Sequence, residues 1–307
     1  MKKRVSLLFA GLVLLGSPKY SASAHPGSGI VVDQQGQVFF IYSKHAICKI
    51  DSRGTLTYIR PIAVGHWMCL DPDGSFSHAQ PKYFERVSTD GVKPALIYAD
   101  GGSPITVMPD GNLYYACSDV QLTPGGLRLA RNSPSGEVTA FASRLPDLNE
   151  KQGIKGLAAG PDGCLYVACP SAVFRVRKDG SFSTLADPIH LEGCDVDYPD
   201  NNTNNFLPSL RGLAVDEQGN VFAAGTACHC VVRISSAGKI EPILKAERPW
   251  SPTGVAVHEG AVYVLEYTHA TEESAKVWLP RVRKIGRDGA VTTLVTITSE
   301  VNLPAKR

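Results

Sequence analysis

The chain has 307 residues, of which 43% are hydrophobic and 20% are charged, with 29 glycines, 21 prolines and a formal net charge of +2. This composition is that of an ordinary globular protein, and it argues against an intrinsically disordered chain, a collagen-like fibre and a protein with several membrane spans. The near-zero charge also argues against a protein that binds nucleic acid through its net charge.

The first 24 residues have the parts of a signal peptide. Basic residues at 2–4 precede an apolar run over 5–16, and Ala22-Ser23-Ala24 is the small-residue pattern that a signal peptidase reads. The run is short for a bilayer, which disfavours an uncleaved anchor. We therefore expect a signal peptide over 1–24, one domain over 25–307, and export to the periplasm or secretion. Cleavage would change the net charge to −2.

A turn of the form Asp-x-x-Gly or Pro-Asp-Gly then recurs along the chain. Each turn glycine is followed by a second glycine, in four of six cases 17 to 19 residues later. The pairs are Gly36 and Gly54, Gly74 and Gly91, Gly111 and Gly136, Gly163 and Gly180, Gly219 and Gly238, and Gly260 and Gly289. This spacing indicates six copies of one structural unit.

Apolar runs on both sides of the turn glycine predict a hairpin in each copy. In the first copy, Ile30–Val32 precedes Gly36 and Val38–Ile41 follows it. Runs of β-branched and aromatic residues around such a turn are typical of paired strands, and glycine supplies the positive φ that the turn needs.

A third and a fourth strand complete each copy. The third strand alternates basic and apolar residues, which indicates that one face of the sheet is exposed to solvent. Examples are Ile47–Ile50, Phe84–Val87, Val173–Val176, Val231–Ile234 and Arg281–Lys284. A fourth run, such as Ser181–Leu185, follows the second glycine. Six copies of roughly forty to fifty residues predict an all-β, six-bladed β-propeller with four antiparallel strands per blade. We expect the sixth blade to pack against the first.

Two stretches, Gly212–Phe222 and Arg281–Leu294, resemble NHL repeats. The chain as a whole resembles the SMP-30 and gluconolactonase-like propellers over residues 28–296, with a weaker likeness to the streptogramin lyases. The resemblance implies the six-bladed fold and implies little about function, because the repeat mainly encodes blade structure.

Three metal ligands that the lactonase resemblance implies are replaced in this chain. The lactonase pattern has Glu at the start of the first inner strand, Asn before an inner-strand glycine, and Asp after a later strand. Here those places hold the stretch 25–28, Lys155 and Arg211, and Cys169. The resemblance therefore does not carry calcium-dependent lactone hydrolysis over to this chain.

One face of the predicted ring carries the longest loops, which usually marks the binding face. Alignment of the copies places Ser28, His66, Ser103, Lys155, Arg211 and Thr253 at the channel mouth on this face. Two fixed cations and a histidine without a carboxylate predict a positive ring that suits a carboxylate or phosphate. The alternative is that Lys155 and Arg211 pair with the acidic stretch 195–200 and are structural.

A second group of polar residues follows the ends of the second strands. His45, Glu266 and His269 would converge with Tyr42 once the sixth blade meets the first. Two histidines and a carboxylate can hold a divalent metal ion, such as Ca, Mg or Zn, or perform acid–base catalysis. The streptogramin lyases resemble this chain in placing Glu and His on such loops. The alternative is that these are loop residues without a ligand.

All eight cysteines follow residue 24, and disulfides are expected in an exported protein. Cys228-His229-Cys230 has zinc or copper ligand types, but the Cys-x-Cys spacing favours disulfides. The positions of Cys117 and Cys169 in adjacent copies make a bridge between them conceivable. The oxygen-rich stretch 195–202 resembles a calcium loop but lacks the EF-hand glycine and glutamate, so an ordinary loop is favoured.

Three functions remain open from the sequence. The leading hypothesis is an exported monomer that binds a small, anionic or carbohydrate-like ligand through Tyr42, His66, Lys155 and Arg211. The first alternative is a metal-assisted lyase or lactonase-like hydrolase that uses Glu266, His269 and His45. The second is a platform for a protein partner, which exposed tryptophans at 67, 250 and 278 would favour. We expect no nucleic-acid partner, and no membrane span after cleavage.

Overall fold

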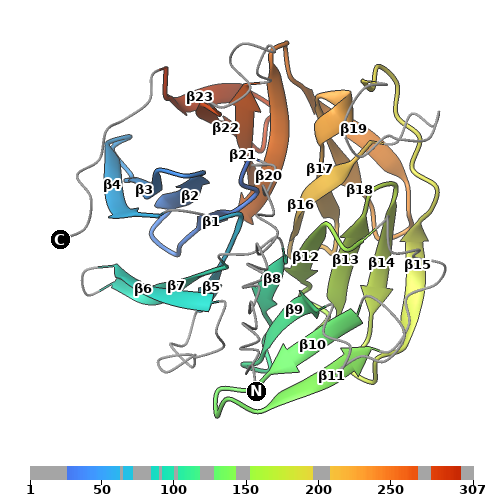
Figure 1. The fold of residues 1–307 in the computed structure, drawn as a ribbon. Helices are drawn as coiled ribbons and strands as arrows, with labels where there is room; N and C mark the ends of the chain where they lie inside the picture. The colour runs from blue at the N-terminus through green and yellow to red at the C-terminus, as the bar shows by residue number, and fades with distance from the viewer. Residues whose placement is uncertain are drawn as a thin grey trace, which may run out of the picture.

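The computed structural model describes residues 26–62, 65–71, 84–89, 92–99, 103–117, 128–142, 153–195, 208–268 and 278–298. The described elements are 23 β-strands and one short 3₁₀ helix, η1 (Thr226–Cys228), so the predicted all-β class is confirmed (Figure 1). Within these ranges, no helix has the length and apolarity needed to cross a membrane. The predicted signal peptide lies outside the described residues and stays a prediction.

Five four-stranded antiparallel sheets form the blades of a propeller. Blade one contains β1 (Ile30–Val32), β2 (Val38–Tyr42), β3 (Ala46–Ile50) and β4 (Leu56–Pro61). Blade three contains β8 (Ile105–Val107), β9 (Leu113–Cys117), β10 (Arg128–Asn132) and β11 (Val138–Ala142). Blade four contains β12 (Gly156–Ala159), β13 (Leu165–Cys169), β14 (Ala172–Val176) and β15 (Phe182–Ala186). Blade five contains β16 (Leu210–Val215), β17 (Val221–Gly225), β18 (Cys230–Ile234) and β19 (Ile240–Lys245). Blade six contains β20 (Trp250–His258), β21 (Ala261–Thr268), β22 (Pro280–Ile285) and β23 (Val291–Thr296).

The second copy of the repeat departs from this pattern, so the prediction of six four-stranded blades is wrong. Its described strands are β5 (Trp67–Asp71), β6 (Phe84–Thr89) and β7 (Val92–Ala99), in the order β5–β7–β6. We call them the second sheet. The expected third strand, Phe84–Val87, lies at the edge, and β7 pairs directly with β5. The sequence supplies a reason, because the run after Gly74 is Ser-Phe-Ser-His-Ala-Gln, whereas 96–98 is the more apolar Leu-Ile-Tyr.

The inner strands close a ring. In order round the ring, β1, β5, β8, β12, β16 and β20 each contact the next, and β20 contacts β1 (Figure 1). The last blade therefore packs against the first, as expected. One apolar cluster joins the two, with Phe40 and Tyr42 from blade one and Tyr263 and Leu265 from blade six.

Four glycines bring the backbones of neighbouring inner strands into contact. These glycines, which we call the glycine seam, are Gly29, Gly156, Gly212 and Gly254. A Cβ atom on Gly254 would lie 2.3 Å from the carbonyl oxygen of Ser28, and one on Gly156 would lie 2.3 Å from that of Arg211. No side chain fits at these distances, so the seam fixes the blades at one level round the channel.

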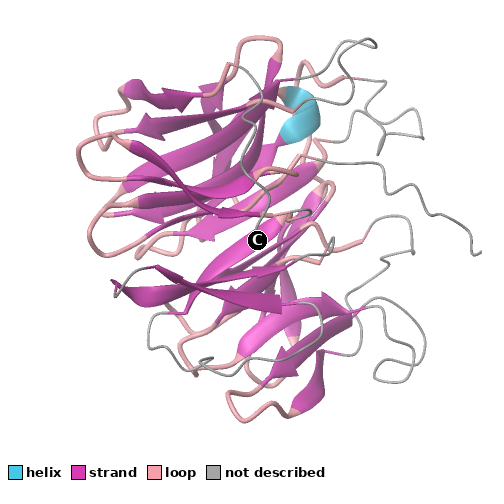
Figure 2. Cartoon of the chain, turned by 60° about the vertical axis from the view of Figure 1, so that its left-hand side comes forward, coloured by secondary structure: helices cyan, strands magenta, loops and turns pink. Residues whose placement is uncertain are grey.

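The predicted turns join the first two strands of the blades. In blade five, Gly219 has a φ of 78°, and its amide donates to the carbonyl of Asp216. In blade four, the Asp162 carboxylate accepts hydrogen bonds from the Cys164 amide (2.9 Å) and the Tyr166 hydroxyl (3.0 Å), and it pairs with Arg175 (2.6 Å). Tight turns line one edge of the ring, and η1 lies at the opposite edge (Figure 2).

Candidate functional site

The structure places the predicted mouth residues of four blades at one level. Ser28, Lys155, Arg211 and Thr253 each directly precede a glycine of the seam. The backbone of His66 adjoins them, because its carbonyl accepts hydrogen bonds from the amides of residues 28 and 29 at 2.7 and 2.8 Å. Ser28 and Thr253 are buried, and the other three side chains are partly exposed. Cations from two adjacent blades therefore share this level of the channel.

Residues 26–29, which we call the mouth segment, run across this level and are held by three blades. The Gly27 amide donates to the Ser43 hydroxyl of blade one at 2.6 Å. The Thr253 hydroxyl of blade six donates to the Gly27 carbonyl at 2.7 Å. The Arg211 guanidinium of blade five donates to the Pro26 carbonyl at 3.4 Å. Sequence reasoning placed Ser28 at the mouth and otherwise treated 25–28 as a departure from a metal-ligand pattern, so it missed this role.

Arg211 combines a side-chain contact to the mouth segment with an unsatisfied hydrogen-bond donor. Its side chain reaches from blade five to the Pro26 carbonyl of the mouth segment. Its Nε is buried and has no hydrogen-bond partner among the described residues. Nor does any described carboxylate contact it, and the predicted alternative partner Asp195 binds His229 and Arg248. Residues 197 and 200, the other candidate partners, lie outside the described residues.

Lys155 lies near the end of β13. Its amide donates to the Ala168 carbonyl at 2.7 Å. Burial and, to a smaller extent, the Asp187 charge raise the pKa of the neighbouring Cys169 thiol to about 12, against the opposing effect of the Lys155 charge. Cys169 is a free, buried thiol, so the conceived Cys117–Cys169 bridge is wrong.

These residues do not fit the divalent metal that a lactonase-type propeller implies. Lysine and arginine cations have no lone pair to donate, and a thiol kept protonated by burial is a poor ligand at neutral pH. Among the described residues, no group of three His, Cys, Asp or Glu side chains is placed to hold a metal ion.

Glu266, the predicted catalytic carboxylate, lies in a buried ion network of blade six. It is 0% exposed, and its two oxygens bind Arg281 (2.6 Å) and Arg283. The largely exposed Glu247 binds the same arginines from outside, and Arg281 lies 4.3 Å from the ring centre of Trp250. A metal ion at Glu266 would have to displace these arginines.

The partners predicted for Glu266 are placed only in part. Tyr42 and His45 stack with their ring centres 4.1 Å apart, as their positions on one tight turn suggest. His269 lies outside the described residues, so the proposed convergence of His45, Glu266 and His269 stays a prediction.

The Cys-His-Cys motif forms a site that sequence reasoning only half recognised. Cys228 bonds to Cys194, which confirms the preference for a disulfide, whereas Cys230 is a free thiol. Between them, His229 is buried, with Nε2 2.8 Å from Asp195 and Nδ1 2.8 Å from the Trp250 carbonyl. Its φ of 52° is uncommon for a residue other than glycine. Asp195 is 34 residues away, so no local pattern could have revealed the pair.

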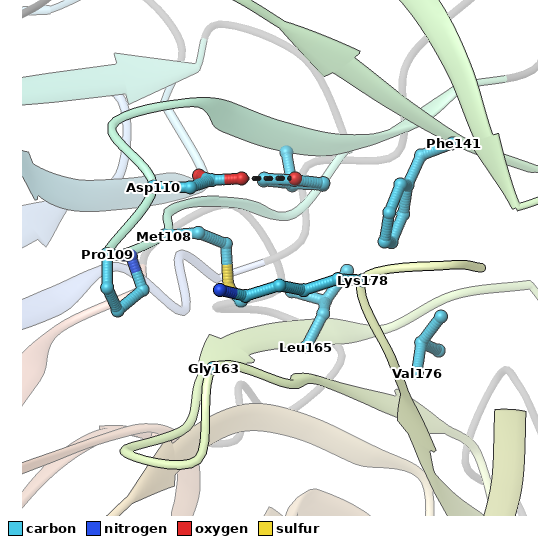
Figure 3. Close-up of a pocket in the computed structure, with 9 residues that line it drawn as sticks. Met108, Pro109, Asp110, Phe141, Gly163, Leu165, Val176 and Lys178 are labelled. Atoms are coloured by element: carbon cyan, nitrogen blue, oxygen red, sulfur yellow. Dashed lines mark hydrogen bonds between the residues drawn. The ribbon is translucent and has the colours of Figure 1, made fainter. Parts of the chain in front are cut away.

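A small cavity between blades three and four lies among the tight turns, away from the mouth (Figure 3). Its lining is mainly apolar and includes Met108, Phe141 and Leu165. Its one carboxylate, Asp110, already accepts a hydrogen bond from the Tyr114 hydroxyl at 2.8 Å. We assign no chemistry to it.

The surface shows no large aromatic patch within the described ranges. Trp67, Trp250 and Trp278 are all partly buried. The large hydrophobic residues exposed there are Phe182 and Val291, which lie on the outer strands of different blades. The observation that would favour a protein-interaction platform is therefore missing from this part of the chain.

No family model and no curated protein matches the chain, but solved structures do. The virginiamycin B lyase of Staphylococcus aureus is similar at 16% identity over 90% of this chain and 85% of that one, with a TM-score of 0.50. A gluconolactonase from Xanthomonas campestris is 15% identical over 79% and 83%, with a TM-score of 0.53. A calcium-binding regucalcin from Agrobacterium tumefaciens is 14% identical over 84% and 89%, with a TM-score of 0.54.

The fold is that of the lyase and lactonase propellers. The resemblance inferred from the sequence is thus confirmed at the level of fold. The NHL-repeat assignment stays a prediction. Because all three identities are low, the chemistry has to be argued from this chain's own residues.

Proposed function

We propose that this propeller binds a small anionic ligand, with a carboxylate or phosphate group, at the mouth of its channel. The observation that carries the proposal is Arg211, which binds the mouth segment and has a buried Nε that no described residue satisfies. A guanidinium in this state favours an oxyanion, which accepts two of its N–H groups at once.

The surroundings of Arg211 support the same conclusion. Lys155, at the same level in the next blade, adds a second positive charge, and His66 adjoins the mouth segment. The glycine seam holds these positions rigidly, so little conformational entropy would be lost when a ligand binds. Hydroxyl groups on the ligand would suit the polar mouth, so a sugar acid combines the two features expected from the sequence.

The proposal includes export of a monomer. The N-terminal pattern and the Cys194–Cys228 disulfide both support maturation in an oxidising compartment. Sequencing of the N-terminus of protein recovered from the native host is expected to begin at residue 25. A protein that retains residues 1–24 would contradict export by this route.

Calorimetric titration of residues 25–307 tests ligand binding. The probes are inorganic phosphate, gluconate and, as a neutral counterpart, glucose. We expect Arg211→Ala to weaken binding of the preferred anion at least tenfold, about 1.4 kcal/mol, because it removes the charged donor. Arg233→Ala is the control, since Arg233 is half exposed and pairs with Glu241 on the outer part of blade five. Equal affinity of Arg211→Ala and the unaltered protein would exclude the site.

A lactonase-like hydrolase is the second candidate, favoured by the fold shared with the gluconolactonase. A metal-assisted mechanism with Glu266, His269 and His45 requires the metal ion to displace the two arginines that pair with Glu266. Hydrolysis of sugar lactones, followed with added Ca, Mg or Zn, tests it. Turnover that His269→Ala abolishes would establish the enzyme, and a protein that binds gluconate without turnover would leave the binding function alone.

A further inference from the structure

The segment from Asp187 to Asp195, which begins the connection from blade four to blade five, is held by two adjacent links. Cys194 forms the disulfide with Cys228, and the next residue on each side, Asp195 and His229, form an ion pair at 2.8 Å. The Asp195 amide also donates to the Ala227 carbonyl at 2.7 Å. Near its other end, the Ile189 amide donates to the Ser171 carbonyl of blade four at 2.7 Å.

His229 joins this segment to blade six as well as to blade five. Its Nδ1 faces the Trp250 carbonyl (2.8 Å) and the Ser251 hydroxyl (2.9 Å), while its Nε2 faces Asp195. A carbonyl and an ionised carboxylate only accept hydrogen bonds, so both ring nitrogens donate when the imidazole carries two protons. Asp195 is thus the acceptor that faces Nε2 of the buried ring.

The charges around the pair are complementary. Arg248 of the blade-six entry binds Asp195 from the solvent side, and Lys245 of β19 donates to the Cys228 carbonyl at 2.8 Å. Burial acts to raise the pKa of Asp195, but hydrogen bonds from Arg248 and His229 outweigh it and hold that pKa below its ordinary value. Departure of Asp195 would remove the 2.8 Å contact of the buried His229 Nε2, which is unfavourable for a buried polar atom.

We propose that the Cys194–Cys228 disulfide and the Asp195–His229 pair form one redox-sensitive latch, which holds the segment Asp187–Asp195 against blades five and six. A dithiol reductant opens it. The dithiol gives up two electrons and becomes a disulfide, and Cys194 and Cys228 each take up a proton as thiols. Attack falls on the Cys194 sulfur, because Cys194 is slightly exposed and Cys228 is fully buried.

The disulfide controls the ion pair because the two are consecutive in the chain. The bond confines Asp195 to the neighbourhood of His229, although Cys194 and Cys228 are 34 residues apart in the sequence. Once it is broken, the pair has to hold the segment without this constraint, and the segment samples open states more often. The latch does not depend on the ligand proposed for the channel mouth.

Cys230 provides a matched control. It lies two residues after Cys228, at the start of β18, and it is a free, buried thiol. Burial raises the pKa of this thiol to about 11, and the Lys245 charge opposes the increase. Cys230→Ser should therefore keep the latch, whereas Cys228→Ser should remove it. Since both variants exchange one sulfur for oxygen, they differ only in whether the disulfide survives.

Hydrogen exchange measured by mass spectrometry on residues 25–307 tests the proposal. With dithiothreitol or in Cys228→Ser, we expect amides of 187–195 and 226–230 to exchange at least tenfold faster, while those of β12 to β14 stay protected. Cys230→Ser without reductant should match the unaltered protein. Asp195→Asn should accelerate exchange in the same peptides only.

Three results would overturn the latch. The first is exchange in 187–195 that reduction leaves unchanged. The second is acceleration in every blade at once, since the disulfide would then be a staple of the whole fold. The third is a disulfide that survives Cys228→Ser and is lost in Cys230→Ser, because the native bond would then join Cys194 to Cys230.

Discussion

The four blades that contain a seam glycine and the second sheet all contribute an inner strand to the ring. They differ in the residue at the seam position and in strand order. In blades one, four, five and six, a glycine directly before the apolar run of the inner strand allows close contact between neighbouring backbones. The second sheet has Trp67 at the corresponding place, after His66, and its strand order departs from that of the blades. Blade three also pairs regularly, with Pro104 at that place, so the glycine accounts for the close backbone contact and not for the regular pairing.

The largest effect should come from the buried charges of blade six, a seamed blade. Glu266→Gln leaves Arg281 and Arg283 without their buried carboxylate, and we expect a loss of about 3–5 kcal/mol in the free energy of unfolding. Urea unfolding measures it. Glu247→Gln is the control, because Glu247 is largely exposed, and it should cost about 1 kcal/mol or less. Equal losses would mean that burial of Glu266 is unimportant.

Substitution in the seam tests the comparison directly. Gly254→Ala places a Cβ atom against the Ser28 backbone, which cannot yield as a side chain would, so we expect a loss of about 3 kcal/mol. Gly289→Ala, where the space is open and φ is 80°, should cost about 1 kcal/mol from backbone strain alone. If the two variants unfold at the same urea concentration, the seam does not hold the blades together.

The smallest effect concerns the turn of blade four. Burial acts to raise the pKa of Asp162, but hydrogen bonds from Cys164, Tyr166 and Arg175 hold it below the ordinary 3.8. The carboxylate therefore contributes stability above about pH 4, and this contribution is lost as the pH falls through the lowered pKa. Asp162→Asn should cost roughly 1 kcal/mol at pH 7 and less near pH 2. Thermal unfolding at both values checks it, and a gap that widens in acid would contradict the sign.

Local patterns in the sequence predicted most of the fold. The recurring turn glycines aligned the copies, and that alignment put Lys155 and Arg211 at equivalent positions, which the structure places directly before seam glycines. The turn glycines located the hairpins. The second sheet was predicted wrongly because strand pairing depends on competition between apolar runs, and β7 offers a more apolar run than the stretch after Gly74.

The cations of the candidate site could be predicted from the sequence, but the contacts between distant side chains could not. Lys155, Arg211 and His66 followed from the alignment of the repeat. The register that sets Glu266 opposite Arg281 did not, because a long loop joins their strands and does not fix the pairing as a tight turn would. The same holds for Asp195 and His229, which meet only after two blades have formed.

The mouth segment also sets an order of events during biosynthesis. Gly27 completes its contacts with Thr253, and Ser43 donates its amide to the Tyr267 hydroxyl at 3.2 Å, partners made more than 220 residues later. The first residues to leave the ribosome therefore complete their contacts only after the last ones have been made. Such non-local pairing slows folding. The ring therefore stays open until the final blade has been synthesised.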